Sequence, residues 1–287
     1  MTDELGVTAA RRRLRMTLKA IREQKRYPLE QVRSGMEWSI SKIIRIESGA
    51  VSISVNDLKV LLDFYDVRDS ERIHELLELA RLSRRRHWAS EYREICSHSY
   101  MDFLGYEDDA WRISHFHPLF VPGLLQTEEY ARAIIRATAT RDMTEAEIES
   151  RVRLRMARQQ RAFAADRDAT IRVAIDESAL SRPIGGQEIL RHQISLIRNR
   201  VLDEQVELVI VPGSLGGHLG LGGPFSLLEF NSEPDPDIVF LDNAPADLAL
   251  VEETQEVVSY KAAFDFLARE GDTQGRVLAR LDDLRLP

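Results

Sequence analysis

Hydrophobic positions in the first part of the chain repeat with the period of short amphipathic helices. Leu14, Leu18 and Ile21 recur four and three residues apart, which predicts a helix over residues 8–24. Four further helices have their own signals. Pro28 suits the first turn of the second helix, Ser39 can cap the third, and Gly49 can be the left-handed residue that follows the third. Ser54 can cap the fourth helix, and the apolar pattern of residues 70–82 predicts the fifth. We expect these helices to form a compact domain over residues 1–86.

The rest of the chain mixes helical and strand patterns. Helical periodicity is expected over residues 127–138, 144–163, 187–200 and 252–269. Runs rich in β-branched and aromatic residues predict strands at 171–175, 206–212, 225–230 and 237–242. Residues 87–287 are therefore expected to form an α+β domain, and the whole chain to be mainly α with an α+β second domain.

The charge of the chain is unevenly divided. The net charge is −8, but residues 1–59 hold twelve Lys/Arg and seven Asp/Glu, a balance of +5, whereas the remainder holds 27 and 40, a balance of −13. A basic end on an acidic body is typical of a protein that contacts phosphates with one part only. The alternative is ordinary variation of charge along a chain.

Composition also excludes several classes of protein. The apolar runs are too short to span a membrane, and the N-terminus lacks the apolar stretch of a secretory signal. The single cysteine, Cys96, argues against an internal disulfide framework and a cysteine-based zinc site. We expect a cytoplasmic protein with no membrane contact and no cofactor.

The segment from Pro28 to Gly49, PLEQVRSGMEWSISKIIRIESG, resembles the helix-turn-helix of Xre/lambda-repressor-like regulators. In that fold the first helix of the pair crosses the phosphate backbone and the second lies in the major groove of double-stranded DNA. The alternative is a helical bundle that is purely structural. The residues expected to contact DNA are Trp38, Ser39, Ile40, Ser41, Lys42 and Arg45.

The expected contacts differ from residue to residue. Arg45 either reads a base or contacts phosphate, and its place one turn into the helix favours base reading. Lys42 is expected on phosphate, whereas Ser41 either contacts a base or is simply solvated. Ile40 either touches a thymine methyl group or belongs to the core. Trp38 is expected to pack at the turn, with its indole N–H free to meet a phosphate.

The resemblance also implies a structural ion pair between Arg22 and Glu47. Two positions depart from the family pattern. Arg33 stands where a small residue is usual, so its side chain must turn outward or change how the two helices approach each other. Glu37 stands where the turn usually has glycine, so it is expected to need a left-handed backbone conformation at some cost in strain.

The second domain also resembles a known family. The segment HPLFVPGLLQTEEYARAII, from His117 to Ile135, is similar to the opening of a domain of unknown function that follows Xre-type heads in antitoxin-like regulators. Later segments agree in order: residues 174–194, 209–230 and 238–243. The resemblance implies a regulator whose second domain senses or binds something, and it implies no established ligand and no established catalysis. We expect a homodimer, with a small partner protein or a small-molecule effector as its further partner. An antitoxin-like protein that sequesters a partner and regulates its own promoter is the alternative.

The second domain contains several candidates for chemistry. The glycine-rich loop 212–224 lacks the Lys-Ser/Thr of a P-loop and precedes a strand, so it is expected to be a connection. His218, Gly217 and Gly222 in this loop are kept as candidate ligand or partner contacts.

Two histidines and two acidic residues are further candidates for metal binding or catalysis. His115 and His117 share one face of a strand, but no third metal ligand at plausible spacing accompanies them, so packing or surface roles are expected and no metal site is predicted. Asp176 and Glu177 end a strand, where either catalysis or helix capping is usual. We expect a non-enzyme; the alternative from another class is a DNA-tethered hydrolase using Asp176, Glu177 and His218.

Overall fold

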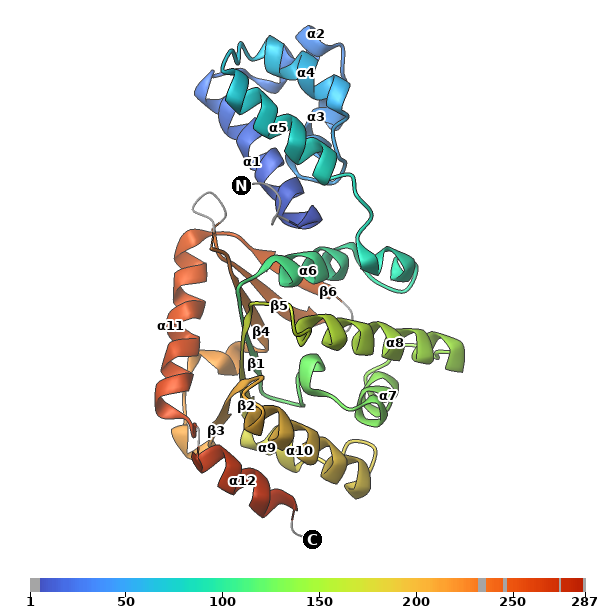
Figure 1. Ribbon diagram of the computed structural model, residues 1–287, viewed down its shortest axis with the longest axis vertical. Helices are drawn as coiled ribbons and strands as arrows, with labels where there is room; N and C mark the ends of the chain where they lie inside the picture. The colour runs from blue at the N-terminus through green and yellow to red at the C-terminus, as the bar shows by residue number, and fades with distance from the viewer. Residues whose placement is uncertain (1–5, 232–235, 245–246, 274, 286–287) are drawn as a thin grey trace. The chain divides into compact units, whose positions relative to one another are not determined.

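The computed structural model describes residues 6–231, 236–244, 247–273 and 275–285. The chain divides into two compact units, Met1–Trp88 and Ala89–Pro287, which we call the head and the body (Figure 1).

The described part of the head forms five α-helices. They are α1 (Val7–Gln24), α2 (Leu29–Met36), α3 (Ile40–Glu47), α4 (Val55–Phe64) and α5 (Ser70–Leu82). The expected caps are present: the Ser39 Oγ accepts the Lys42 N–H at 3.1 Å, and the Ser54 Oγ accepts the Asp57 N–H at 2.9 Å. Gly49 has the left-handed φ of 81° that its place after α3 predicts.

The helices of the head enclose one hydrophobic core. Val32 and Met36 from α2 meet Ile43 and Ile46 from α3 in a cluster that also contains residues of α1, α4 and α5. One detail differs from the sequence expectation: Pro28 precedes the first turn of α2 as its extended cap. Ile40 is 38% exposed, which removes the core from the two roles left open for it. Ile40 is the first residue of α3, and it lies outside the buried side of the helix that Ile43 and Ile46 form.

The body combines a six-stranded sheet with helices. Its strands are β1 (Arg112–His117), β2 (Thr170–Asp176), β3 (Glu207–Val211), β4 (Phe225–Glu229), β5 (Ile238–Ala244) and β6 (Asp247–Val251). Its α-helices are α6 (His98–Asp109), α7 (Glu128–Ala137), α8 (Glu145–Ala162), α9 (Glu177–Ser181), α10 (Gln187–Leu202), α11 (Thr254–Glu270) and α12 (Gly275–Arg285). Short 3-10 turns occur at η1 (Trp88–Tyr92), η2 (Gly123–Leu125), η3 (Gly213–Leu215) and η4 (Leu219–Gly222).

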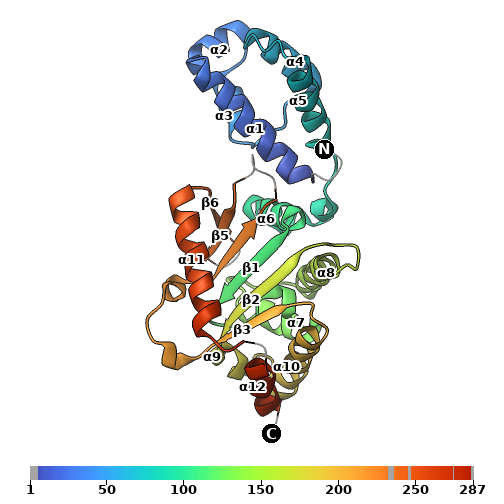
Figure 2. The ribbon, with the colours of Figure 1, turned by 60° about the vertical axis from the view of Figure 1, so that its left-hand side comes forward.

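The sheet has the order β3-β2-β1-β4-β5-β6. Its first three strands in that order are parallel, and β4, β5 and β6 continue antiparallel from β1. Helix α11 covers one face, where its Phe264 and Leu267 belong to the same hydrophobic cluster as Phe116 of β1, and α6, α7, α8 and α10 lie on the other side (Figures 1 and 2). The predicted fold class, mainly α with an α+β second domain, is confirmed.

Several elements of the body were absent from the sequence expectation. Helices α6, α9 and α12 and strand β6 were not predicted, and β1 was considered only as a possible strand around its two histidines. Strand β1 lies in the middle of the sheet although Ser114, His115 and His117 are polar. A hydropathy pattern cannot identify such a strand, because its polar groups are buried against partners that only the tertiary structure supplies.

Candidate nucleic-acid interface

Helix α3 presents one exposed face. Ile40 is 38% and Ile44 49% exposed, and Ser41 and Arg45 are also exposed. Residues at these spacings lie on the same side of a helix. Ile44 was missed by the sequence analysis; the available signal was its place four residues after Ile40, away from the buried face. The exposed face therefore combines two apolar side chains with one hydroxyl and one guanidinium.

Arg45 is the free cation of this face. Its side chain makes no hydrogen bond or ion pair with any residue that the structure describes. A free guanidinium can donate two parallel hydrogen bonds to the O6 and N7 atoms of guanine. Its position in the last turn of α3, one turn from Ser41, leaves both side chains available to a ligand.

Lys42 is differently placed. Its Nζ lies 3.1 Å from the Asp57 Oδ2 in the first turn of α4 and 3.9 Å from the centroid of the Trp38 ring. Both members of the ion pair are more than one third exposed, at 38% and 39%. Such a pair contributes about 1 kcal/mol or less, so a phosphate could replace Asp57 as the partner of Lys42. Trp38 is half-buried and forms part of the packing at the turn.

A bidentate ion pair holds the end of α3 against α1. Arg22 donates from Nε to the Glu47 Oε1 at 2.6 Å and from Nη2 to the Glu47 Oε2 at 2.9 Å, and both side chains are only 12% exposed. Arg22 also donates to the Tyr27 carbonyl at 3.2 Å. The hydrogen bond to Glu47 raises the pKa of Arg22. The pair that the resemblance implied is therefore present, and it sets where the exposed face of α3 lies.

The two departures from the family pattern are accommodated locally. Glu37 has φ 53° and ψ 34°, the left-handed conformation expected there. Arg33 turns outward, is 47% exposed and pairs with Glu30 on the same helix. The helix pair thus keeps its packing at a cost of about 1–2 kcal/mol in backbone strain at Glu37.

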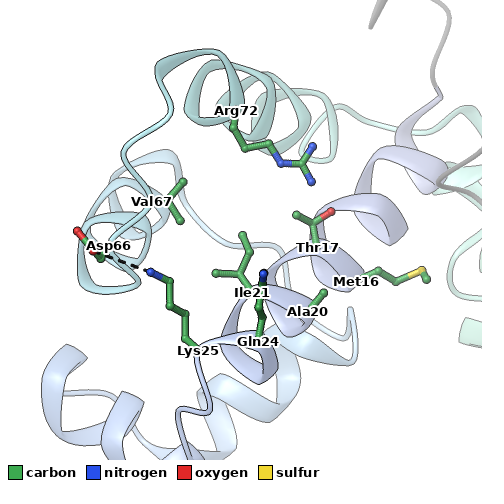
Figure 3. A pocket seen from close by; sticks show the side chains of 9 residues that line it. All are labelled: Met16, Thr17, Ala20, Ile21, Gln24, Lys25, Asp66, Val67 and Arg72. Atoms are coloured by element: carbon green, nitrogen blue, oxygen red, sulfur yellow. Dashed lines mark ion pairs between the residues drawn. The ribbon is translucent and has the colours of Figure 1, made fainter.

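A hollow on the head lies away from the exposed face of α3. Figure 3 shows the residues that line it, which come from α1 and the residue after it, from the segment after α4 and from α5: Met16, Thr17, Ala20, Ile21, Gln24, Lys25, Asp66, Val67 and Arg72. The Lys25 Nζ lies 3.9 Å from the Asp66 Oδ2 at its rim. Because α3 contributes no lining residue, the hollow is not part of the candidate interface.

The glycine-rich loop 212–224 of the body was the second candidate region. His218 packs edge-on against Phe116, with ring centroids 5.8 Å apart, and its Nδ1 is buried without a hydrogen-bond partner in the described chain. Gly217 and Gly222 stand in open space, with nothing within 4 Å of an added Cβ. The loop also exposes Leu219 and Leu221, at 54% and 64%.

The three residues considered for hydrolysis have separate roles. Asp176 caps α9 by accepting the Ser178 N–H at 2.9 Å. The Glu177 Oε1 accepts the Gly213 N–H at 2.8 Å, which ties the start of loop 212–224 to the end of β2. His218 packs on Phe116 instead. Within the described residues, no hydrogen bond or ion pair joins His218 to Asp176 or Glu177.

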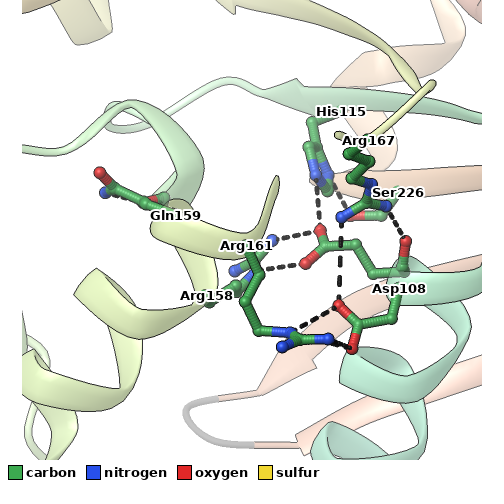
Figure 4. Close-up of polar contacts among 9 residues, drawn as sticks. Asp108, His115, Arg158, Gln159, Arg161, Arg167 and Ser226 are labelled. Carbon is green, nitrogen blue, oxygen red and sulfur yellow. Dashed lines mark hydrogen bonds and ion pairs between the residues drawn. The ribbon is translucent and has the colours of Figure 1, made fainter. Parts of the chain in front are cut away.

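The body buries a polar cluster beside β1 (Figure 4). Glu107 at the end of α6 accepts two hydrogen bonds from Arg158 of α8, at 2.6 and 2.7 Å. His115 lies between Glu107, at 3.2 Å, and the Ser226 Oγ, at 2.7 Å. Burial alone would raise the pKa of Glu107, but Arg158 and His115 outweigh it and hold the pKa at about 2. The cluster joins α6, α8, β1 and β4.

His117 has a different environment from His115. Its Nδ1 accepts the backbone N–H groups of Leu119 and Phe120 at 3.2 and 3.3 Å. Burial, with a contribution from His115, lowers the pKa of His117 to about 3. No group of three potential metal ligands occurs among the described residues. His115 is hydrogen-bonded within the polar cluster, and His117 packs against the Phe120 ring.

Comparison with known families accounts for both units. A family model described as a helix-turn-helix domain matches residues 13–76, and one described as a domain of unknown function (DUF5753) matches residues 100–283. No curated protein and no solved structure matches the chain. In the described part of the chain, no helix is both long and apolar enough to cross a membrane.

Proposed function

The chain belongs to the DUF5753 family and carries a helix-turn-helix domain ahead of the DUF5753 domain. We propose that this protein is a sequence-specific transcriptional regulator of the Xre type. The DNA-binding assignment in general follows from the helix-turn-helix match. The Xre type, the residues that read DNA and the role of the body are the proposal.

The observation that carries this proposal is the exposed face of α3. Arg45 has no partner in the described chain, whereas Ile43 and Ile46 on the opposite face are buried in the core. A helix anchored in this way can enter the major groove without unfolding the head. Arg45 and Ser41 read base edges, and the exposed Ile40 and Ile44 contact thymine methyl groups.

Lys42, Trp38 and Ser39 surround the reading residues. Lys42 exchanges its partly exposed ion pair with Asp57 for a DNA phosphate. Trp38 stacks on Lys42 and orients it, and the Ser39 Oγ is used as the cap of α3. These three residues hold the head on the backbone and contribute little to sequence preference.

The test separates reading from holding. An operator is first selected from random DNA with the full chain, and variants are then measured on this operator and on scrambled DNA across a salt series. Arg45→Ala should cost about 1–3 kcal/mol on the operator and relax preference at one base pair. Lys42→Ala should weaken binding to both DNAs and lower the salt slope by about one unit.

Arg68→Ala is the matched control, because Arg68 is an exposed arginine of the head that pairs with Asp63 and Asp66 outside α3. It should leave the operator preference unchanged. If Arg45→Ala weakens binding to the operator and to scrambled DNA equally and keeps the base preference, Arg45 contacts phosphate and its assignment as a base-reading residue is wrong.

The body supplies the second half of the proposal. Helix-turn-helix dimers read half-sites about 34 Å apart, so one head cannot span an operator. We assign dimer or partner contacts, or an effector response, to the body, with loop 212–224 and its exposed Leu219 and Leu221 as the contact region. An antitoxin-like regulator would use the same surface for a small partner protein.

Sedimentation of the full chain and of a variant with Leu219→Ser and Leu221→Ser tests this assignment. A loss of the dimer with operator preference retained supports the loop as the interface. A dimer that is unaffected by both changes removes the loop from this role.

A further inference from the structure

One face of α8 carries a row of arginines directed into the body. Arg151, Arg155 and Arg158 are four and three residues apart, so they share one side of the helix. This side packs against η2 and α6. Arg158 is fully compensated, because its guanidinium donates two hydrogen bonds to the buried Glu107 (Figure 4).

Arg155 has no acidic partner of this kind. Its Nη1 donates to the neutral Gln126 Oε1 at 2.7 Å, and no carboxylate within ion-pair distance is found among the described residues. The backbone of η2 lies close against it: a Cβ on Gly123 would be 3.6 Å from the Arg155 Nε. Burial lowers the pKa of Arg155. Tyr100 opposes this shift, the neighbouring charges of Arg158 and Arg151 add to it, and Asp242 makes the smallest contribution, in the raising direction.

Arg151 extends the uncompensated charge by one helical turn. Its Nε is buried and has no hydrogen-bond partner in the part of the chain that the structure describes. Both Arg151 and Arg155 remain partly accessible at the surface. A half-enclosed cation without a counter-ion is costly, and two adjacent ones repel each other. An anion bound between the two guanidinium groups would offset both costs.

We propose that Arg151 and Arg155 bind the phosphate group of a small molecule. Two uncompensated guanidinium groups match the charge of a phosphate monoester, about −1.5 to −2 at neutral pH, better than that of a monocarboxylate. Guanidinium groups also fit phosphate oxygens with paired hydrogen bonds. This site lies within the body and does not depend on the proposed DNA contacts.

The experiment uses the full chain and inorganic phosphate as the probe. Calorimetry and thermal unfolding are compared in phosphate, acetate and chloride at matched ionic strength. The wild type is expected to bind phosphate in the millimolar range or tighter and to melt at a higher temperature in phosphate than in chloride or acetate. Arg155→Gln and Arg151→Gln are each expected to weaken phosphate binding about tenfold or more, the loss of one charge-assisted contact.

Two control variants locate the effect. Arg153→Gln removes an exposed arginine from another face of α8, and it should leave phosphate binding unchanged. Lys42→Ala should also leave it unchanged, which separates this site from phosphate contacts of the head. Without phosphate, Arg155→Gln should melt at the same temperature as the wild type or higher, because it removes an uncompensated charge; a merely structural arginine would lower the melting temperature in every buffer.

Three results would overturn the proposal. The first is equal stabilisation by phosphate and chloride. The second is an equal loss of phosphate binding in Arg153→Gln and Arg155→Gln. The third is equal binding of acetate and phosphate, which would show that the site does not select a dianion.

Discussion

Loss of the Arg22–Glu47 pair should destabilise the head far more than loss of an exposed pair. Its two hydrogen bonds, at 2.6 and 2.9 Å, join side chains that are each 12% exposed. Breaking a buried pair costs about 3–5 kcal/mol and an exposed one less than about 1 kcal/mol. We expect Arg22→Met to cost about 3 kcal/mol, because it leaves the Glu47 carboxylate unpaired at the C-terminal end of α3, where the helix dipole is unfavourable to it.

A double-mutant cycle isolates the pair. Glu47→Gln should cost less than Arg22→Met, because the amide oxygen still accepts one hydrogen bond from Arg22. The coupling between the two changes should be about 1–3 kcal/mol. Unfolding of residues 1–88 by urea, followed by circular dichroism, measures these free energies, since this unit encloses its own core.

The matched control is Arg33→Met, which removes the exposed pair with Glu30, where the two side chains are 47% and 60% exposed. It should change stability by less than about 1 kcal/mol. Costs of Arg22→Met and Glu47→Gln that simply add, with no coupling, would refute the idea that this pair fixes the end of α3.

Three further changes test other parts of the structure. Asp57→Asn should release Lys42 from its ion pair and strengthen binding to scrambled DNA several-fold, by up to about 1 kcal/mol, with a steeper salt dependence in the same titrations. An unchanged affinity would show that the ion pair does not compete with phosphate. Gly35→Ala should lower the melting temperature of the head at a cost of about 1–3 kcal/mol, because its Cβ would lie 2.0 Å from the Phe64 ring; an unchanged melting temperature would contradict the tight packing of α2 on α4. His117 is neutral in the folded body because burial lowers its pKa to about 3. The unfolded chain takes up this proton at higher pH, so stability is lost as pH falls from about 6.5 toward 3. His117→Gln should reduce this loss in melting curves recorded between about pH 7 and 4.

The helices of the head could be predicted from the sequence because their signals are local. The cap at Ser39, the glycine at Gly49 and the spacing of Ile43 and Ile46 act within one or two helical turns, and the structure places each as expected. The left-handed backbone at Glu37 was expected from the family resemblance, in which glycine usually stands at this turn. Local sequence was therefore sufficient for the helix-turn-helix and for the buried face of α3.

The body shows where this reasoning ends. Strand β1 is central although it contains Ser114, His115 and His117, because Glu107 and Ser226 from distant segments satisfy His115. Its polarity hid it from a pattern that equates buried strands with apolar runs. A buried polar residue is tolerated only where a hydrogen-bond partner lies beside it, and the fold decides which residue that partner is.

Charges divide in the same way between sequence and structure. The sequence by itself determined that the first part of the chain is basic and that α3 carries Lys42 and Arg45. Only the tertiary structure decided that Asp57 of α4 pairs with Lys42. It also decided that, among the described residues, the side chain of Arg45 has no partner and Arg155 hydrogen-bonds to a neutral glutamine with no carboxylate at ion-pair distance. The physical reason is that an ionic interaction falls off with distance through space, and α3 and α4, or η2 and α8, come close only when the core has closed.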